Sequence, residues 1–363
     1  MNNDLQWGIF LLTTQSPGLT PEEVIRRATD YTLYAEKLGM NSAWTLEHHF
    51  TKYGLVGSAL TQAAFLLGKT ATINVGTAIN VIPTEHPVRL AEEVALLDQM
   101  SGGRVMFGIG RGHFIKDYMV FGVDMSKNTE MLMEGYELMM QAWATGSCSA
   151  QSEYYNFPKV DVNPPTYTKP NPPVFTVATS PETLEWAGSK GIPLLLTAFY
   201  DDEELLGMMQ FYNEIADANG HDINAIPHVL TRIGGAATTF DIRAASVPLL
   251  NWWMDEFTGA SSLYTTQGKN IRGYDWHRRR REQAIMRGEK KPSAGSQKVI
   301  DINPIGSPQE CIDKLSRSME ILGVRHAAFG FEAVSDSVQI VKESMDCFNE
   351  EVLPKITLPE KVW

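Results

Sequence analysis

The chain alternates, over nearly its whole length, between short apolar runs bounded by turn residues and longer stretches with the periodicity of helices. Because a helix is the usual connection between parallel strands, this alternation predicts an α/β fold built around a parallel sheet. Eight strand-and-helix units can be counted. Eight units favour a closed (β/α)8 barrel, or TIM barrel, formed by one domain over residues 1–363. An open doubly wound sheet would produce similar local patterns, so it remains the alternative.

Strands and helix starts can be placed on the sequence. The predicted strands are Leu5–Leu12, Ser42–Leu46, Ile73–Ile82, Val105–Ile109, Val174–Ala178, Pro193–Thr197, His228–Gly235 and His326–Gly330. The first helix has the signature of a capping box in Thr20-Pro21-Glu22-Glu23, and Gly39 suits its end. Ser180-Pro181-Glu182-Thr183 and Ser307-Pro308-Gln309-Glu310 repeat this signature, so we expect a capping side chain at each of these starts.

Two stretches interrupt the alternation. Residues 145–172 contain Pro158, Pro164, Pro165, Pro170 and Pro172, and we interpret them as an ordered insertion loop after the fourth strand. Residues 258–302 follow the seventh strand and include the basic run 277–281. Loops of this length in a compact domain are usually functional lids or disordered segments. We expect the second stretch to be a lid over the open end of the barrel.

Composition narrows the possible partners and compartment. A net charge of −12 disfavours duplex nucleic acid and anionic membrane surfaces, which would repel the chain. No apolar run approaches the roughly 20 residues that a membrane helix needs. Cys148, Cys311 and Cys347 lie far apart, and the N-terminus has no signal-peptide pattern. We therefore expect a reducing, cytoplasmic environment and a small-molecule partner.

Titratable side chains crowd the end of the second predicted strand. Glu47, His48 and His49 follow the apolar run 42–46 directly, at the position where barrel enzymes carry their chemistry. Imidazole titrates near neutral pH, so a histidine here is a candidate general base. Imidazole and carboxylate groups also bind metals, and Glu85, His86 and His113 would be further candidate ligands. Adjacent residues at a strand end point in different directions, and no His-x-His pair is present, so we expect no metal.

Two further motifs follow predicted strands and could bind an anion. Gly108-Ile109-Gly110-Arg111-Gly112-His113-Phe114 combines small residues with the cationic fork of Arg111, although such glycines also serve ordinary turns. Thr179-Ser180-Pro181-Glu182-Thr183 places hydroxyl groups at a helix N-terminus, which suits a phosphate, although an ordinary N-cap has the same pattern. In a barrel both motifs would face the same mouth as His48.

The chain resembles the bacterial luciferase-like flavin monooxygenases, and among them the alpha subunits, from about Leu5 to Ile356. The resemblance rests on matching segments in the same order, which include Leu46–Thr51, Pro83–Arg89, Leu97–Ser101, Phe107–Ile109, Arg272–Asp275 and Ile302–Ile312. It implies a (β/α)8 barrel that takes reduced FMN from a separate flavin reductase and reacts it with O2. The resulting C4a-hydroperoxide would place one oxygen atom on a carbonyl substrate such as a long-chain aldehyde.

The resemblance also implies roles for particular residues. His48 matches the catalytic histidine, Glu47 lies beside the flavin, and the bond between Ala78 and Ile79 falls at the family's cis peptide. The remaining expected cofactor-binding residues are Arg111, His113, Phe114, Thr179, Ser180, Thr183 and Thr197, of which Arg111, Ser180 and Thr183 match ligands of the FMN phosphate. Residues 262–295 match the family's mobile loop. His49 is expected to be a structural, hydrogen-bonded histidine.

Three departures from the alpha subunits qualify these expectations. Gly110 stands where they have a reactive cysteine, so a thiol role is absent and we expect a roomier pocket there. Thr179 replaces a glutamate, and Thr197 is followed by Ala198 where they have a tryptophan. A catalytically silent, beta-like supporting subunit and a true light-emitting alpha subunit remain as alternatives. The family pairs through the helices of the second and third units, so we expect a homodimer, with a heterodimer still open.

Overall fold

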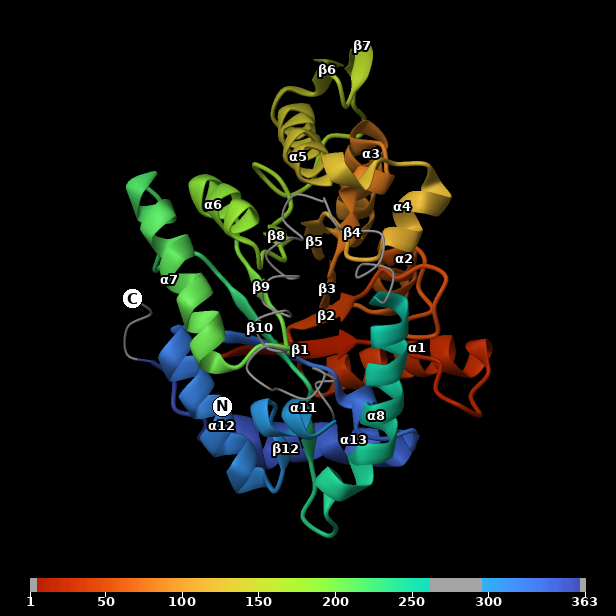
Figure 1. Cartoon of the computed structure of the whole chain (residues 1–363), viewed down its shortest axis with the longest axis vertical. Coiled ribbons are helices and arrows are strands. Elements are labelled where there is room, and N and C mark those ends of the chain that lie inside the picture. The colour runs from red at the N-terminus through yellow and green to blue at the C-terminus, as the bar shows by residue number, and fades with distance from the viewer. Residues whose placement is uncertain (1–4, 262–295, 360–363) are drawn as a thin grey trace, which may run out of the picture.

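The parallel strands form a closed barrel in the computed structural model, which describes residues 5–261 and 296–359 (Figure 1). The barrel strands are β1 (Gln6–Leu11), β2 (Ser42–Thr45), β3 (Asn74–Thr77) with its continuation β4 (Asn80–Val81), β5 (Val105–Gly110), β8 (Val174–Thr176), β9 (Leu195–Leu196), β10 (Val229–Arg232) and β13 (His326–Phe329). Each of them falls within, or within one residue of, a strand predicted from the sequence. The strand predictions are therefore confirmed; β5 is one residue longer than predicted, and the other strands are shorter.

The order of hydrogen-bonded neighbours separates a barrel from an open sheet. From β1 the sheet runs through β2, β3 and β5 to β8 in one direction, and through β13 and β10 to β9 in the other. Every pairing along this path is parallel. A parallel bridge between Thr176 and Leu194 then joins the β8 and β9 sides. The ring is closed, so the doubly wound alternative is wrong.

Helices surround the barrel. They are α1 (Pro21–Lys37), α2 (Ala59–Lys69), α3 (Pro87–Ser101), α4 (Ile115–Phe121), α5 (Asn128–Thr145), α6 (Pro181–Lys190), α7 (Asp202–Ala218), α8 (Ile242–Ser261), α11 (Ser296–Ile302), α12 (Pro308–Leu322) and α13 (Val338–Cys347). Thr20 and Ser307 form the predicted capping boxes of α1 and α12. The third predicted cap is wrong, because the Ser180 side chain makes no capping hydrogen bond to α6.

Side chains fill the barrel interior, so it is a packed core. Trp44 is completely buried there, and its ring meets the edge of Phe175 with 5.1 Å between centroids. The indole Nε1 donates to Ser42 Oγ at 3.0 Å, and this oxygen lies 3.0 Å from His326 Nε2. A glycine at position 76 is required, because a Cβ atom there would lie 2.4 Å from the Trp44 ring. The polar atoms of Ser42, Trp44 and His326 are thus paired, which offsets the cost of burying them.

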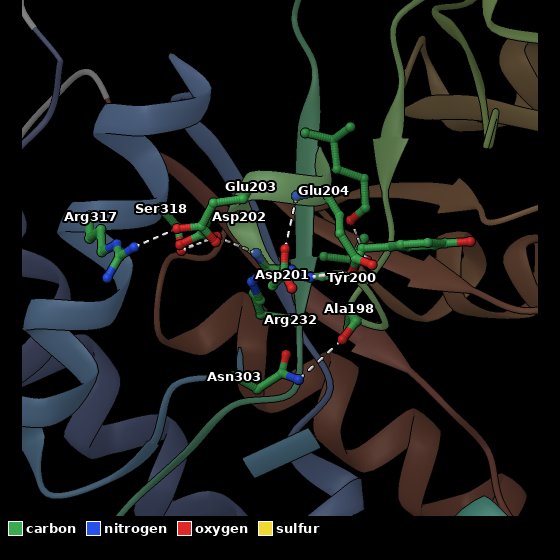
Figure 2. Close-up of polar contacts among 12 residues, drawn as sticks. Ala198, Tyr200, Asp201, Asp202, Glu203, Glu204, Arg232, Asn303, Arg317 and Ser318 are labelled. Carbon is green, nitrogen blue, oxygen red and sulfur yellow. Dashed lines mark hydrogen bonds and ion pairs between the residues drawn. The ribbon is translucent and has the colours of Figure 1, made fainter. Parts of the chain in front are cut away.

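A buried arginine fastens the outer helices to the barrel. Arg232 ends β10 and is 1% exposed, and its Nη2 atom pairs with Asp202 Oδ1 at 2.7 Å. The same Asp202 oxygen accepts a hydrogen bond from Ser318 Oγ, so one carboxylate joins β10, α7 and α12 (Figure 2). Nearby, Asn303 donates to the Ala198 carbonyl at 3.1 Å (Figure 2), and it accepts a hydrogen bond from the backbone N–H of Ile233. These contacts hold the chain just after α11 against the barrel.

The two interruptions differ from the predictions in instructive ways. The stretch 145–172 is ordered, as predicted, but it contains an antiparallel hairpin of β6 (Ser147–Gln151) and β7 (Asn156–Asp161), which projects beyond α5 and α3 (Figure 1). The ends of the second stretch are helical, in α8 and α11. The short strands β11 (Gly235–Ala236) and β12 (Ile305–Gly306) pair beside it. The predicted lid, residues 262–295, lies outside the described residues.

No helix in the described part of the chain is long and apolar enough to cross a membrane.

A histidine side chain supports the closure of the ring. His228 is 3% exposed, and its Nδ1 atom accepts a hydrogen bond from the backbone N–H of Leu194, the residue that bridges to Thr176. Accepting this bond requires an unprotonated nitrogen, and burial lowers the pKa of His228 to about 3. Protonation of the imidazole at low pH therefore requires the loss of this hydrogen bond.

Replacing His228 with glutamine should make the fold less sensitive to acid. Because the folded pKa lies below the ordinary value of 6.5, the stabilisation is complete above pH 6.5 and is lost as pH falls toward 3. One such group changes the free energy of unfolding by up to about 1.4 kcal/mol per pH unit. The amide side chain of the variant could still accept the bond but would not titrate. Urea unfolding at pH 7, 6, 5 and 4 should give a shallower decline for His228→Gln than for the wild type, and parallel declines would contradict the assignment.

Candidate active site

A pocket of about 740 Å³ opens at the carboxyl ends of the barrel strands, and it gathers most of the predicted site. The predicted residues that line it are Glu47, His48, Ala78, Ile79, Arg111, His113, Phe114, Thr179 and Thr183. They follow β2, β3, β5 and β8, which are neighbours in the barrel. The bond between Ala78 and Ile79 is cis, as the resemblance implies. Residues far apart in the sequence thus share one cavity.

Two predicted residues lie outside this lining. Ser180 is completely buried and accepts a hydrogen bond from Arg111, which lines the pocket. Thr197 follows β9 and is half-buried, but it does not line the pocket. Its expected place beside the flavin stays a prediction.

Arg111 and two hydroxyl groups form one corner of the pocket. The Arg111 side chain is 9% exposed, and it donates from Nη2 to Ser180 Oγ at 3.2 Å and from Nη1 to Thr129 Oγ1 at 3.1 Å. Ser180 Oγ and Thr183 Oγ1 lie 3.0 Å apart at the start of α6, which lacks a side-chain cap. A cation, hydroxyl donors and an uncapped helix N-terminus together attract an anion such as a phosphate.

Glu47 is a buried structural acceptor as well as a pocket residue. Its carboxylate accepts from the backbone N–H of Ala59 at 3.1 Å, from Asn80 Nδ2 at 3.1 Å and from the backbone N–H of Val81 at 3.0 Å. Burial raises the pKa of Glu47 to about 7, although these hydrogen bonds oppose the shift. The side chain therefore connects the start of α2 to the strand segment β4, a role that the sequence did not reveal.

His48 lies against aromatic rings at the pocket wall. Its ring centroid is 4.8 Å from that of Tyr53 and 5.3 Å from that of Phe114. Burial lowers the pKa of His48 to about 3, and the adjacent His49 contributes to the shift. The imidazole is therefore neutral at physiological pH, and its unprotonated nitrogen can accept a hydrogen bond from a bound hydroxyl group. His49 differs from expectation, since its Nε2 lies 4.0 Å from Glu47 Oε1 and its ring packs on Phe121 without a hydrogen bond among the described residues.

Asp117 is a pocket residue that the sequence interpretation missed. It lies on α4 and is 3% exposed, and its Oδ1 atom has no hydrogen-bond partner among the described residues. Burial raises the pKa of Asp117 to about 7, and Lys116 only partly offsets this. Glu47 and Asp117 thus both have raised pKa values, so the pocket carries less negative charge at neutral pH than its carboxyl groups suggest.

The glycines in β5 and just after it accommodate side chains from the neighbouring strand. A Cβ atom at Gly110 would lie 2.7 Å from Ile79 Cδ1, and one at Gly112 would lie 2.7 Å from Val81 Cγ1. The space beside Gly110 is therefore filled by Ile79, and the expectation of a roomier pocket is wrong. The glycine motif is explained by this close packing, which a sequence pattern cannot distinguish from a turn or an anion-binding loop.

An aromatic wall, made of Tyr53, Phe114, Phe199, Trp253 and Phe257, stands beside His48. Trp253 and Phe257 come from α8 and stack on Phe199, with centroids 5.5 and 5.2 Å away. Phe257 also stacks on His113 at 5.9 Å. Phe114 is one of the residues expected from the sequence. The other four come from separate parts of the chain, and the aromatic content of 251–257 is a sequence signal only for Trp253 and Phe257. Among the described residues, no three His, Cys, Asp or Glu side chains gather as a metal site.

Comparisons with known proteins agree on one family. The family model described as "Luciferase-like monooxygenase" matches residues 5–326. The alkanal monooxygenase alpha chain of the Kryptophanaron alfredi symbiont is 38% identical over 355 residues, which cover 96% of this chain and 98% of that protein. The alkanal monooxygenase beta chain of Vibrio harveyi is 30% identical over 345 residues, with 92% and 95% covered.

A solved structure shows the same fold at much lower identity. It is the oxygenating constituent of 3,6-diketocamphane monooxygenase from Pseudomonas putida, a type II Baeyer-Villiger monooxygenase in complex with FMN. The TM-score is 0.77 at 17% identity, and the match covers 98% of this chain and 99% of that chain. From the family model and the curated relatives together, the chain belongs to the luciferase-like monooxygenases.

Proposed function

We propose that the chain is an FMN-dependent monooxygenase that uses O2 to oxidise a carbonyl compound, with a long-chain aldehyde as its substrate. The observation that carries the proposal is the placing of the anion corner, Arg111 with Ser180 and Thr183, at the same pocket as neutral His48. The alkanal monooxygenase names of the relatives support an aldehyde. The diketocamphane enzyme, which has the same fold, supports a carbonyl substrate more broadly.

The residues of the pocket fit reduced FMN. Arg111, Ser180 and Thr183 would hold its phosphate, and the apolar surfaces of Ile79 and Val177 would lie against its ring system. The raised pKa values of Glu47 and Asp117 reduce the repulsion that an anionic cofactor would meet. When bound, reduced FMN supplies the two electrons that activate O2, and a separate flavin reductase would supply it in that form.

The chain's own groups would position the reactants and move a proton. His48, neutral and within the cavity, would accept a proton from a reacting hydroxyl group or return it to the product. The aromatic wall would exclude water from this side of the pocket, which protects a reactive oxygen species from loss to solvent. A beta-like supporting subunit would have no need of this set of groups, so their presence supports the enzyme over the silent subunit.

Isotope labelling tests the function directly. The purified chain, reduced FMN, decanal and ¹⁸O2 should yield decanoic acid with one ¹⁸O atom, oxidised FMN and water. A light detector on the same reaction would distinguish a luminous enzyme from a dark one. If acid forms only after another subunit is added, the chain works in a heterodimer, and His48→Asn in this chain then decides its role: unchanged acid formation would make it the supporting subunit. If no acid forms from any aldehyde or ketone tested, the proposed function is wrong.

Two variants should separate binding from chemistry. Arg111→Met should weaken reduced FMN binding roughly ten- to a hundredfold, because a charged hydrogen-bonding partner of the phosphate is lost, and should leave riboflavin binding unchanged. His48→Asn should leave FMN binding nearly intact but slow acid formation on the order of a hundredfold. Anaerobic titration and single-turnover product analysis give the two readouts. Equal losses of binding and turnover in both variants would contradict the separate roles.

We also propose that the chain forms a homodimer through α2 and α3, as the resemblance implies, and that it works in the cytoplasm, where its free cysteines would stay reduced. Apolar side chains are exposed on these helices: Phe65 is 52% exposed, Leu96 49% and Met100 75%. Burying such a patch stabilises an interface.

Charge placed on this face should therefore separate the subunits. Leu96→Glu with Met100→Glu should convert the dimer to a monomer in light scattering coupled to gel filtration. Ile25→Glu, the same change at a 40% exposed position on α1, is the control that should remain dimeric. A wild-type chain that is monomeric at micromolar concentration would contradict the homodimer and favour a second kind of subunit.

A further inference from the structure

The third barrel strand and β5 interlock through alternate positions on one side. Gly108, Gly110 and Gly112 lack side chains, and the atoms facing them belong to residues 77, 79 and 81. A Cβ atom at Gly108 would lie 1.9 Å from the Thr77 carbonyl oxygen, and one at Gly110 would lie 2.7 Å from Ile79 Cδ1 and 3.0 Å from its Cγ1. Real Cβ atoms do not approach other atoms so closely, so a side chain at any of these positions would force its neighbour to shift.

The pair of Ile79 and Gly110 is distinguished by where it lies. Both residues line the pocket, and they meet through the flexible end of the isoleucine side chain. Gly108 faces backbone, so no side-chain change can relieve its contact. Gly112 has a φ of +75°, a conformation that other residues rarely adopt. Gly110 has neither restriction. Of these three pairs, only 79 and 110 could therefore exchange a large residue on one strand for a large residue on the other.

We infer that Ile79 determines the specificity of this pocket for the flavin ring. It does so as one half of a size-complementary pair with Gly110, in which the Ile79 side chain fills the space beside both positions. This inference rests on the proposed function, because it assigns to Ile79 the surface on which the flavin ring lies. Ile79 is half-buried although it is surrounded by the barrel, and the uncovered part of its side chain faces the cavity that it lines. Removing its outer carbons would leave a void at this surface, and a side chain added at position 110 would refill it.

A double-mutant cycle on the ligand-free protein tests the packing. Gly110→Ala should lower the Tm by several degrees in the wild type, by less with Ile79→Val, and least with Ile79→Ala, because these changes remove first Cδ1 and then the remaining outer carbons. Leu184→Ala on α6 is a matched control, since it removes buried apolar volume but does not contact Gly110. It should combine additively with Gly110→Ala. Additive behaviour of Ile79 and Gly110 as well would overturn the pairing.

Equilibrium binding of reduced FMN under anaerobic conditions tests the specificity role. Ile79→Ala should weaken binding roughly tenfold through lost contact, and Ile79→Ala with Gly110→Val should recover most of that loss. Gly110→Val alone should weaken binding because the two side chains compete for one space. A merely structural role would change the Tm without this loss and recovery of affinity.

The possible failures can be told apart. Coupled Tm values with unchanged FMN affinity in Ile79→Ala would overturn the specificity role while the proposed function stands. If the wild type binds no reduced FMN, the proposed function fails, and the ligand part of this inference fails with it. The stability cycle still decides the pairing in that case, because it needs no ligand.

Discussion

The mouth of the barrel depends on the buried carboxylate of Glu47. It accepts three N–H groups, from the first residue of α2 and from both residues of β4. Two elements that are not neighbours in sequence are thereby held to the end of β2. His48 follows Glu47 directly, and Ile79 precedes Asn80, so the candidate base and the pocket surface are both positioned through this one group. Burial disfavours its charge while the hydrogen bonds favour it, which explains a pKa raised only to about 7.

A second group of contacts connects the end of β5 to the start of α6. Arg111 follows β5 and contacts hydroxyl groups at the start of α6, which follows β8, the strand paired to β5. Because Ser180 is not occupied in capping α6, its hydroxyl group is oriented toward the arginine and Thr183. The anion corner is therefore formed by neighbouring barrel strands, and its geometry is fixed by the sheet.

The sequence predicted what depends on local patterns and missed what depends on distant contacts. Strand positions and the capping boxes at Thr20 and Ser307 follow from periodicity and neighbouring residues, so they could be predicted. The bond between Arg111 and Ser180 joins residues 69 positions apart, and no local rule distinguishes it from an ordinary cap. The filled space at Gly110 and the aromatic wall around His48 also depend on which strands and helices become neighbours. The resemblance supplied the residues of the pocket, but it could not supply their packing.

The interlocked strands constrain how this pocket can change over generations. A side chain at position 110 is crowded while isoleucine stands at 79, whereas the loss of bulk at 79 leaves a void. The order of substitutions therefore matters, because a smaller residue on the third strand relieves the crowding before a side chain is added on β5. A lineage that acquires a cysteine or any other reactive side chain at 110 loses less stability if it first passes through a form with a smaller residue at 79, so the two positions are expected to change as a pair.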